Sequence, residues 1–133
     1  MTDTTPTESN LSGLDRKDFQ KNINSRKTDL YILKNAQGME VAVTNYGCAI
    51  LSIMVPDKNG KFANVILGHD SIEHVINSPE PFLSTTIGRY GNRIANWKCT
   101  LYCEEHLLTV NNGPNSLHGG PTGFHARVWD AVQ

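Results

Sequence analysis

The fold of this chain follows from one stretch of sequence, Cys48-Ala49-Ile50-Leu51-Ser52-Ile53-Met54-Val55 followed by Pro56-Asp57-Lys58-Asn59-Gly60. The first eight residues are almost all apolar and include several β-branched side chains, which predicts a buried β-strand. The Pro-to-Gly segment after them is typical of a hairpin turn, and residues 62–67 supply the returning strand. The stretch therefore predicts an antiparallel sheet.

Further strands are predicted on both sides of this hairpin. Upstream, an apolar run at 30–34 and alternating residues at 39–44 flank a turn at 35–38. Downstream, a strand is expected at 82–87 and a hairpin between 98–101 and 105–110. Residues 70–73 have the form of a capping box with Asp70 as the cap, so one short helix should run to Ile76. At least six strands and at most one or two short helices predict an all-β fold, an antiparallel β-sandwich.

Composition limits the classes of protein to which the chain can belong. The hydrophobic share is 38%, the charged share 19% and the formal net charge −1, so the chain is neither disordered nor basic enough to favour nucleic acid. The N-terminus lacks the pattern of a signal peptide and no apolar run reaches the roughly 18 residues of a membrane span, which predicts a cytoplasmic protein without membrane contact. Residues 1–27 are expected to form a polar arm, loose or packed laterally with Phe19 among its anchors, and 28–133 the domain.

The cysteines indicate neither a disulfide framework nor a metal site. Their number, three, is odd, and no export signal is present. Cys99, Cys103 and His106 could be imagined as ligands, but their spacing matches no common zinc pattern. We therefore expect reduced cysteines and no bound metal.

Two polar blocks carry the functional signal. The first is Gly88-Arg89-Tyr90-Gly91-Asn92-Arg93-Ile94-Ala95-Asn96, and the second is Asn111-Asn112-Gly113-Pro114-Asn115-Ser116-Leu117-His118-Gly119-Gly120. The first combines two guanidinium groups and an amide with glycines that allow tight turns. The second places an imidazole on a loop of restricted shape. Such groups suit a neutral ligand rich in hydroxyl groups.

These blocks resemble the aldose 1-epimerases, also called galactose mutarotases. The resemblance runs from about Leu30 to Trp129, and its motifs stand in the order of the family: Thr44-Asn45-Tyr46-Gly47, then Val55-Pro56-Asp57-Lys58-Asn59-Gly60, then Val65-Ile66-Leu67-Gly68, then the two blocks, then Gly123-Phe124 and Val128-Trp129. Together they are a specific signal, whereas each alone would be weak. The resemblance implies a galactose mutarotase-like sandwich that acts on monosaccharides.

The resemblance also implies roles for particular residues. The family interconverts the α and β anomers of free hexoses such as galactose and glucose by acid/base ring opening, without a cofactor. Asn92 and Arg93 match its sugar-binding pair, and His118 matches its first pocket histidine; the alternative is that all three only staple loops. For Arg89 we expect a structural salt bridge, and His125 receives no role. Candidates for an apolar platform under the sugar are Tyr90, Trp97, Phe124 and Trp129.

The sequence also departs from the family pattern. The second histidine and the late glutamate that supply the family's acid and base cannot be located, so we expect the chain to be incomplete and catalytically weak or dead alone. Residues Tyr102 and Cys103 replace the best turn residues of the 98–110 hairpin, which should be longer, bulged or poorly formed. Exposed strand edges favour self-association. Two alternatives stay open: a non-catalytic carbohydrate-binding module and a β-sandwich fragment that contacts another protein.

Overall fold

The computed structural model describes residues 10–132. Its main element is a four-stranded antiparallel sheet in the order β3-β4-β5-β6. The strands are β3 (Leu30–Lys34), β4 (Glu40–Thr44), β5 (Ile50–Pro56) and β6 (Phe62–Asn64). Three of the four begin and end within two residues of the predicted limits; β6 ends three residues early. The prediction of an all-β fold built from antiparallel strands is confirmed.

The hairpin between β5 and β6 forms as its sequence predicts. The Asp57 carboxylate accepts hydrogen bonds from the backbone N–H groups of Asn59 (2.7 Å) and Lys61 (2.9 Å). This side chain closes the turn in the manner that favours Asp at such positions. The turn sets the register in which Met54 faces Asn64 and Pro56 faces Phe62.

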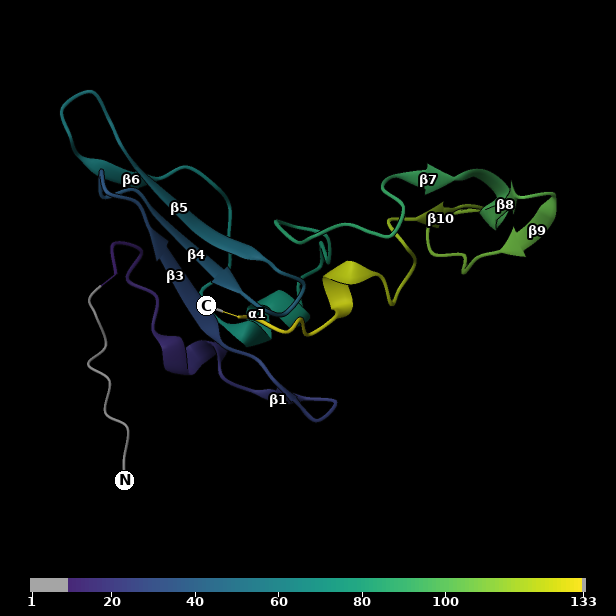
Figure 1. Ribbon diagram of the computed structural model, residues 1–133, viewed down its shortest axis with the longest axis horizontal. Helices are drawn as coiled ribbons and strands as arrows, with labels where there is room; N and C mark the ends of the chain where they lie inside the picture. Colours follow the sequence, from purple (N-terminus) through teal and green to yellow (C-terminus); the bar gives the residue numbers. More distant parts are fainter. Residues whose placement is uncertain (1–9, 133) are drawn as a thin grey trace.

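Residues 10–27 pack against one face of the sheet. They contain a 3₁₀ turn, η1 (Arg16–Phe19), and the short ribbon of β1 (Asn22–Ile23) and β2 (Arg26–Lys27). The α-helix α1 (Ile72–Ile76) lies beside η1 (Figure 1). Phe19, one of the expected anchors, is fully buried in a core with six further apolar residues, namely Leu30, Ala42, Ala49, Leu51, Ile72 and Val75.

Two polar side chains are buried where this segment meets the sheet. Glu40, on the inward face of β4, has no exposed surface, and its carboxylate accepts hydrogen bonds from the N–H groups of Leu11 (3.0 Å) and Ser12 (3.2 Å). The second is Asp29, whose carboxylate accepts two hydrogen bonds from the Arg16 guanidinium, at 2.8 and 2.6 Å. Burial acts to raise the pKa of Asp29, but the hydrogen bonds from Arg16 and the Leu30 N–H outweigh it, so the pKa is lowered.

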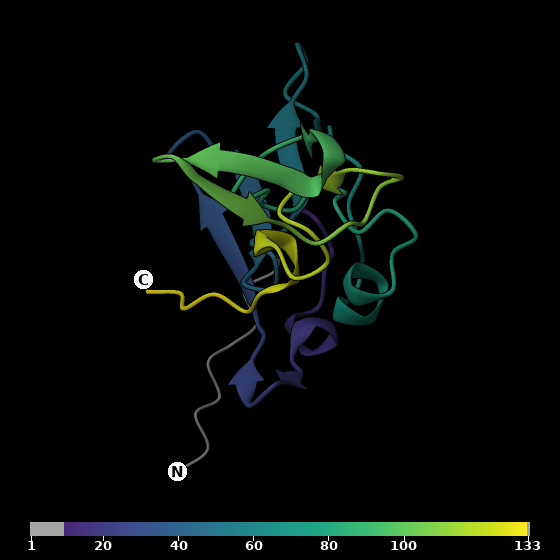
Figure 2. The same ribbon diagram turned by 90° about the vertical axis from the view of Figure 1, so that its right-hand side faces the viewer.

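Short elements form the other end of the molecule (Figure 1). They are β7 (Arg93–Ile94) paired with β10 (Ser116–Leu117), the 3₁₀ turn η2 (Ala95–Trp97), and the hairpin of β8 (Lys98–Leu101) and β9 (Glu104–Leu107). The 3₁₀ turn η3 (Phe124–Ala126) lies between this end and the main sheet (Figure 1). Figure 2 shows the β8–β9 hairpin crossing in front of the main sheet. Most of its side chains are exposed.

Three local predictions were wrong. Residues 82–87 form no strand; they make turns and irregular backbone, and Ser84 has a positive φ of 57°. The N-cap of α1 is Ser71, whose hydroxyl accepts the His74 N–H at 3.3 Å, and not Asp70, which pairs instead with the His74 ring. The β8–β9 hairpin is neither long nor bulged, because Tyr102 and Cys103 alone close it, both with positive φ.

Candidate functional site

The β7–β10 ribbon brings the two polar blocks together. Arg93 lies opposite Leu117 and Ile94 lies opposite Ser116, so the loop before β7 runs beside the loop after β10. Residues that are 26 positions apart become neighbours: the His118 N–H donates to the Asn92 carbonyl at 3.0 Å, and the Asn92 N–H donates to Nδ1 of His118 at 2.9 Å. The structure therefore places all three predicted site residues at one ribbon end.

The bond from Asn92 fixes the chemistry that His118 presents. Since Nδ1 accepts a hydrogen bond, the neutral imidazole carries its proton on Nε2. The ring thus offers an N–H donor from Nε2. Because His118 is only half-buried, a ligand can reach its imidazole.

Arg93 is oriented by two amides. Its Nε donates to Oδ1 of Asn112 at 2.8 Å, and its Nη1 donates to Oδ1 of Asn92 at 3.3 Å. Asn112 was not singled out from the sequence, because its contact depends on the turn in which Asn112 and Asn115 pair across the loop. Both Arg93 and Asn92 are exposed. With its amide oxygen occupied, Asn92 keeps its NH₂ group for a ligand.

The Phe82 ring packs against the imidazole of His118. Phe82 packs edge-to-face against His118 at 4.8 Å between ring centroids and, in the same way, against His125 at 4.6 Å. The irregular backbone at 82–87, which was predicted as a strand, is what brings Phe82 there. His125, for which no role was predicted, is 6% exposed, and its Nδ1 has no hydrogen-bond partner within residues 10–132. Burial, and secondly the charge of His118, lower the pKa of His125.

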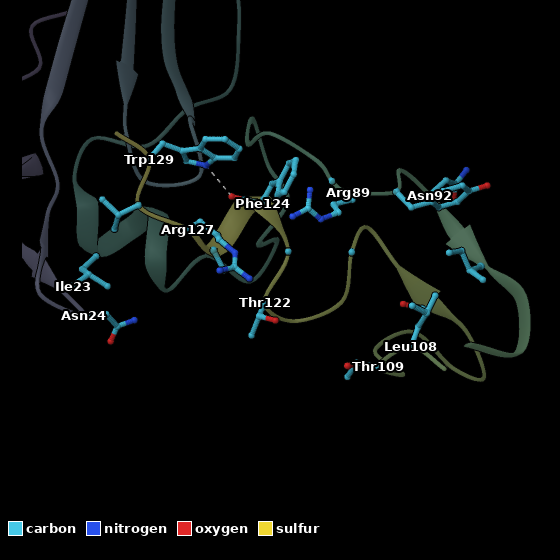
Figure 3. A pocket seen from close by; sticks show the side chains of 18 of the residues that line it. Ile23, Asn24, Arg89, Asn92, Leu108, Thr109, Thr122, Phe124, Arg127 and Trp129 are labelled. Atoms are coloured by element: carbon cyan, nitrogen blue, oxygen red, sulfur yellow. Dashed lines mark hydrogen bonds between the residues drawn. The ribbon is translucent and has the colours of Figure 1, made fainter. Parts of the chain in front are cut away.

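A cavity of about 1000 Å³ opens beside the ribbon (Figure 3). Asn92 lines it, but Arg93 and His118 do not. Within β7 the side chains alternate, so Ile94 faces the cavity and Arg93 faces the opposite side of the ribbon. Three of the four candidate platform aromatics also line the cavity, namely Tyr90, Phe124 and Trp129.

Arg89 also lies on the cavity wall, and the prediction of a salt bridge for it was wrong. In the part of the chain that the structure describes, no carboxylate pairs with Arg89; its guanidinium lies over the Phe124 ring, 5.5 Å from the centroid. Phe124 in turn packs edge-to-face on Trp129 at 5.0 Å. Phe124 is thus enclosed between a cation and an indole, which leaves little of it for a sugar face.

Within residues 10–132 the cysteines and histidines form no metal-binding cluster. Cys99 and His106 face each other across the β8–β9 hairpin, and all three cysteines are free. Within residues 10–132 no group of three or more His, Cys, Asp or Glu side chains is placed to hold a metal ion. No helix in the same residues is both long and apolar enough to span a bilayer.

Antiparallel sheets with almost no helix and a polar loop site define an all-β protein with a candidate ligand site. A family model for aldose 1-epimerase matches residues 29–133. The chain belongs to the aldose 1-epimerase family.

Known proteins of the family match only with part of their length. Galactose mutarotase from Bos taurus is 40% identical over 91 residues, which are 68% of this chain and 26% of that protein. Aldose 1-epimerase from Escherichia coli is 40% identical over 103 residues, 77% of this chain and 30% of that protein. A solved GalM/aldose epimerase homologue from C. elegans superposes with a TM-score of 0.74 at 33% identity, covering 80% of this chain and 32% of that one. The chain thus spans about a quarter to a third of these relatives.

Proposed function

We propose that this chain contributes one wall of the sugar site of an aldose 1-epimerase, which interconverts the α and β anomers of free hexoses such as galactose and glucose. The observation that carries the proposal is the cluster of Asn92, Arg93 and His118, joined by hydrogen bonds at the end of the β7–β10 ribbon. Its side chains offer mainly N–H donors: Nε2 of His118, the amide of Asn92 and the remaining N–H groups of the Arg93 guanidinium. Such a wall complements the oxygen atoms of a pyranose.

The same donors suit the chemistry of ring opening. A base must remove the proton of the anomeric hydroxyl while an acid protonates the ring oxygen, and both steps place charge on sugar oxygens. Donors fixed before the reaction stabilise that charge without having to reorient. We assign neither the acid nor the base within the described residues, so we expect the chain alone to bind a hexose without accelerating its mutarotation.

Polarimetry and calorimetry test the two parts of the proposal separately. Freshly dissolved α-D-galactose should mutarotate at the buffer rate in the presence of the chain. A faster rate that disappears in His118→Ala would contradict the expected inactivity. In calorimetric titration, galactose or glucose should release or absorb heat with the wild type and not with His118→Ala, whereas His106→Ala, an exposed histidine on the hairpin, should leave binding unchanged.

A chain that is folded by circular dichroism but binds no common hexose would refute the sugar-wall assignment. A second candidate, a non-catalytic carbohydrate-binding module, predicts the same binding without turnover. The cluster supports this candidate because it is complete without an assigned acid or base.

A further inference from the structure

Two rings beside His118 have no part in the proposed sugar contacts. Phe82 packs edge-to-face against the imidazoles of both His118 and His125, with 4.8 and 4.6 Å between the ring centroids. The hydrogen bond from the Asn92 N–H holds Nδ1 of His118, but a single bond leaves the imidazole free to tilt about that atom. The contact with Phe82 is a second constraint, and it fixes the plane of the ring.

The segment that carries Phe82 is bound to the main sheet. The Ile50 N–H, at the start of β5, donates to the Ser84 carbonyl at 2.9 Å, and the Thr86 N–H donates to the Gly47 carbonyl at 2.8 Å. These bonds hold the irregular backbone around Phe82 without a strand ladder. The position of Phe82 is therefore set by the main sheet and not by the loop that carries His118.

His125 packs against Phe82 as a buried, neutral ring. It is 6% exposed, and its Nδ1 has no hydrogen-bond partner in the part of the chain that the structure describes. Burial, and secondly the charge of His118, lower the pKa of His125, so the ring is neutral at about pH 7. An imidazole that leaves a buried nitrogen unpaired contributes through the packing of its ring and not through that nitrogen.

Two glycines allow His125 to lie between the main sheet and the loop of His118. A Cβ added at Gly47, in the turn before β5, would overlap the His125 carbonyl oxygen. A Cβ added at Gly123 would lie 2.7 Å from the His118 carbonyl oxygen and 3.1 Å from Nδ1 of His125. His125 is therefore in close contact with both parts, and its ring fills the space beside Phe82.

From these contacts we propose that Phe82 and His125 are positioning residues for His118. They hold the imidazole at the angle at which its Nε2–H meets a sugar oxygen while Nδ1 accepts the Asn92 N–H. This inference rests on the proposed sugar site and adds to it two residues that act through His118 and not on the sugar. A donor that is already fixed binds without the cost of ordering it, so the two rings raise the affinity for the sugar.

Calorimetric titration with galactose tests the effect on binding. Phe82→Leu and His125→Ala should each weaken binding by about threefold to tenfold, the range that corresponds to one aromatic pair. His125→Phe keeps a ring in the same place and should bind within about twofold of the wild type. Phe62→Leu is the matched control, because it makes the same substitution at a half-buried phenylalanine on β6 and should leave binding unchanged.

¹⁵N NMR of the His118 ring, assigned by its loss in His118→Ala, gives a readout that a general loss of stability would not move. At about pH 8, above the ordinary histidine pKa of about 6.5, the wild type should show a single neutral tautomer with the proton on Nε2. Phe82→Leu and His125→Ala should show a mixture of the two tautomers, because a tilting ring loses the bond from Asn92. Phe62→Leu should show one.

The outcomes separate the positioning role from the sugar site. A wild type that binds galactose, with Phe82→Leu and His125→Ala that bind equally well and keep a single tautomer, overturns the positioning role and leaves the sugar proposal standing. A wild type that binds no hexose refutes the sugar site, and a single tautomer in both variants then overturns the positioning role as well. Should Phe82→Leu fail to fold by circular dichroism, equal affinity of His125→Ala and His125→Phe would overturn the proposal.

Discussion

At the scale of single residues, the site depends on backbone conformations that most side chains avoid. Asn92 and His118 both have positive φ, 66° and 55°. Such conformations persist only where the surrounding structure enforces them, and here two hydrogen bonds between the same pair of residues do so. The orientation of the imidazole is therefore set by the backbone conformation of His118 and by the packing of its ring against Phe82.

Gly119 permits this arrangement. It has a φ of +84°, and a Cβ added there would overlap the Gly88 carbonyl. We expect Gly119→Ala to lower the free energy of unfolding by at least about 2 kcal/mol, from the strained φ and the clash together. Gly113→Ala is the matched control, because its φ is +56° but nothing lies within 4 Å of the added Cβ. It should cost only about 1 kcal/mol. Urea unfolding measures both, and equal losses would contradict the clash.

His125 should make stability depend on pH. Burial, followed by the charge of His118, lowers its pKa below the ordinary value of 6.5. As the pH falls below 6.5, the unfolded chain binds a proton that the native chain does not, so stability falls; above that pH the contribution is fully present. The uncharged Phe82 packs edge-to-face against the ring, and His118 is the titratable group whose charge acts on it.

The measurement is the free energy of unfolding between pH 7.5 and 5 for the wild type and His125→Phe. The variant should show a flatter dependence. Asp29 does not interfere in this range, because its lowered pKa places its own loss of stability below its ordinary value of 3.8. Identical slopes for the two proteins would show that His125 does not titrate differently on folding.

At the scale of elements, the β8–β9 hairpin is closed by a turn whose two central residues adopt a backbone conformation that is unfavourable for their side chains. Tyr102 and Cys103 both adopt positive φ, 51° and 66°, as the centre of a type I′ turn requires. Asn-Gly is the preferred pair at such a centre, and a side chain with a full Cβ costs about 1 kcal/mol at each position. The tight turn forms because it closes the register in which Leu101 faces Glu104.

Replacing both residues, Tyr102→Asn with Cys103→Gly, should stabilise the hairpin by about 1–2 kcal/mol. Because the hairpin is exposed and local opening precedes global unfolding, amide hydrogen exchange is the suitable measurement. Exchange at Cys99, Leu101 and their hydrogen-bonded partners His106 and Glu104 should slow by about tenfold or more. Unchanged exchange would mean that the strain at the turn is negligible.

Sequence reasoning succeeded where a hydrophobic alternation or a single turn motif determined the secondary structure. The alternation at 39–44 and the Asp-Lys-Asn-Gly turn give β4 and the β5–β6 hairpin directly. It failed at 82–87, where the residues form no ladder. Phe82 packs against two imidazoles, the Ser84 carbonyl accepts from the Ile50 N–H at the start of β5, and the Thr86 N–H donates to the Gly47 carbonyl. Spacing does not encode such contacts between loops.

The site divides in the same way. The adjacency of Asn92, Arg93 and His118 was expected from the family motifs, and the structure places them together. Asn112, Phe82 and His125 were missed, since each meets the site from another loop. The alternation of β7 would have shown that Arg93 and Ile94 face opposite sides, had a two-residue strand been recognised there.

At the scale of the whole molecule, the segment at 127–129 joins the two ends. The Gly47 N–H donates to the Arg127 carbonyl at 2.7 Å, and the Trp129 N–H donates to the Asn45 carbonyl at 2.8 Å. The apolar core lies entirely on the side of the main sheet and includes Phe19. The site end therefore depends on a core to which residues 10–27 contribute.

Phe19→Ala tests that dependence. Removal of a fully buried phenyl ring should cost about 3–5 kcal/mol in the free energy of unfolding. Tyr102→Ala removes an aromatic ring of similar size that is 100% exposed, and it should change stability by at most about 0.5 kcal/mol. A small effect of Phe19→Ala in urea unfolding would mean that residues 10–27 are dispensable to the core.

Unpaired strand edges should make the chain self-associate. Within residues 10–132, β3 and β6 are the outer strands of the main sheet. The apolar side chains of Val65 and Leu67, which follow β6, are 60% and 76% exposed. An edge of this kind offers backbone groups and apolar surface to a second copy.

Sedimentation velocity should show a weight-average mass that rises with concentration. Val65→Lys with Leu67→Lys should move the population toward monomer, because charge on an edge opposes pairing. Val132→Lys places one added charge on a residue that is 97% exposed and outside every strand, so it should not dissociate the assembly. Dissociation by either variant alike would assign the effect to net charge and not to the β6 edge.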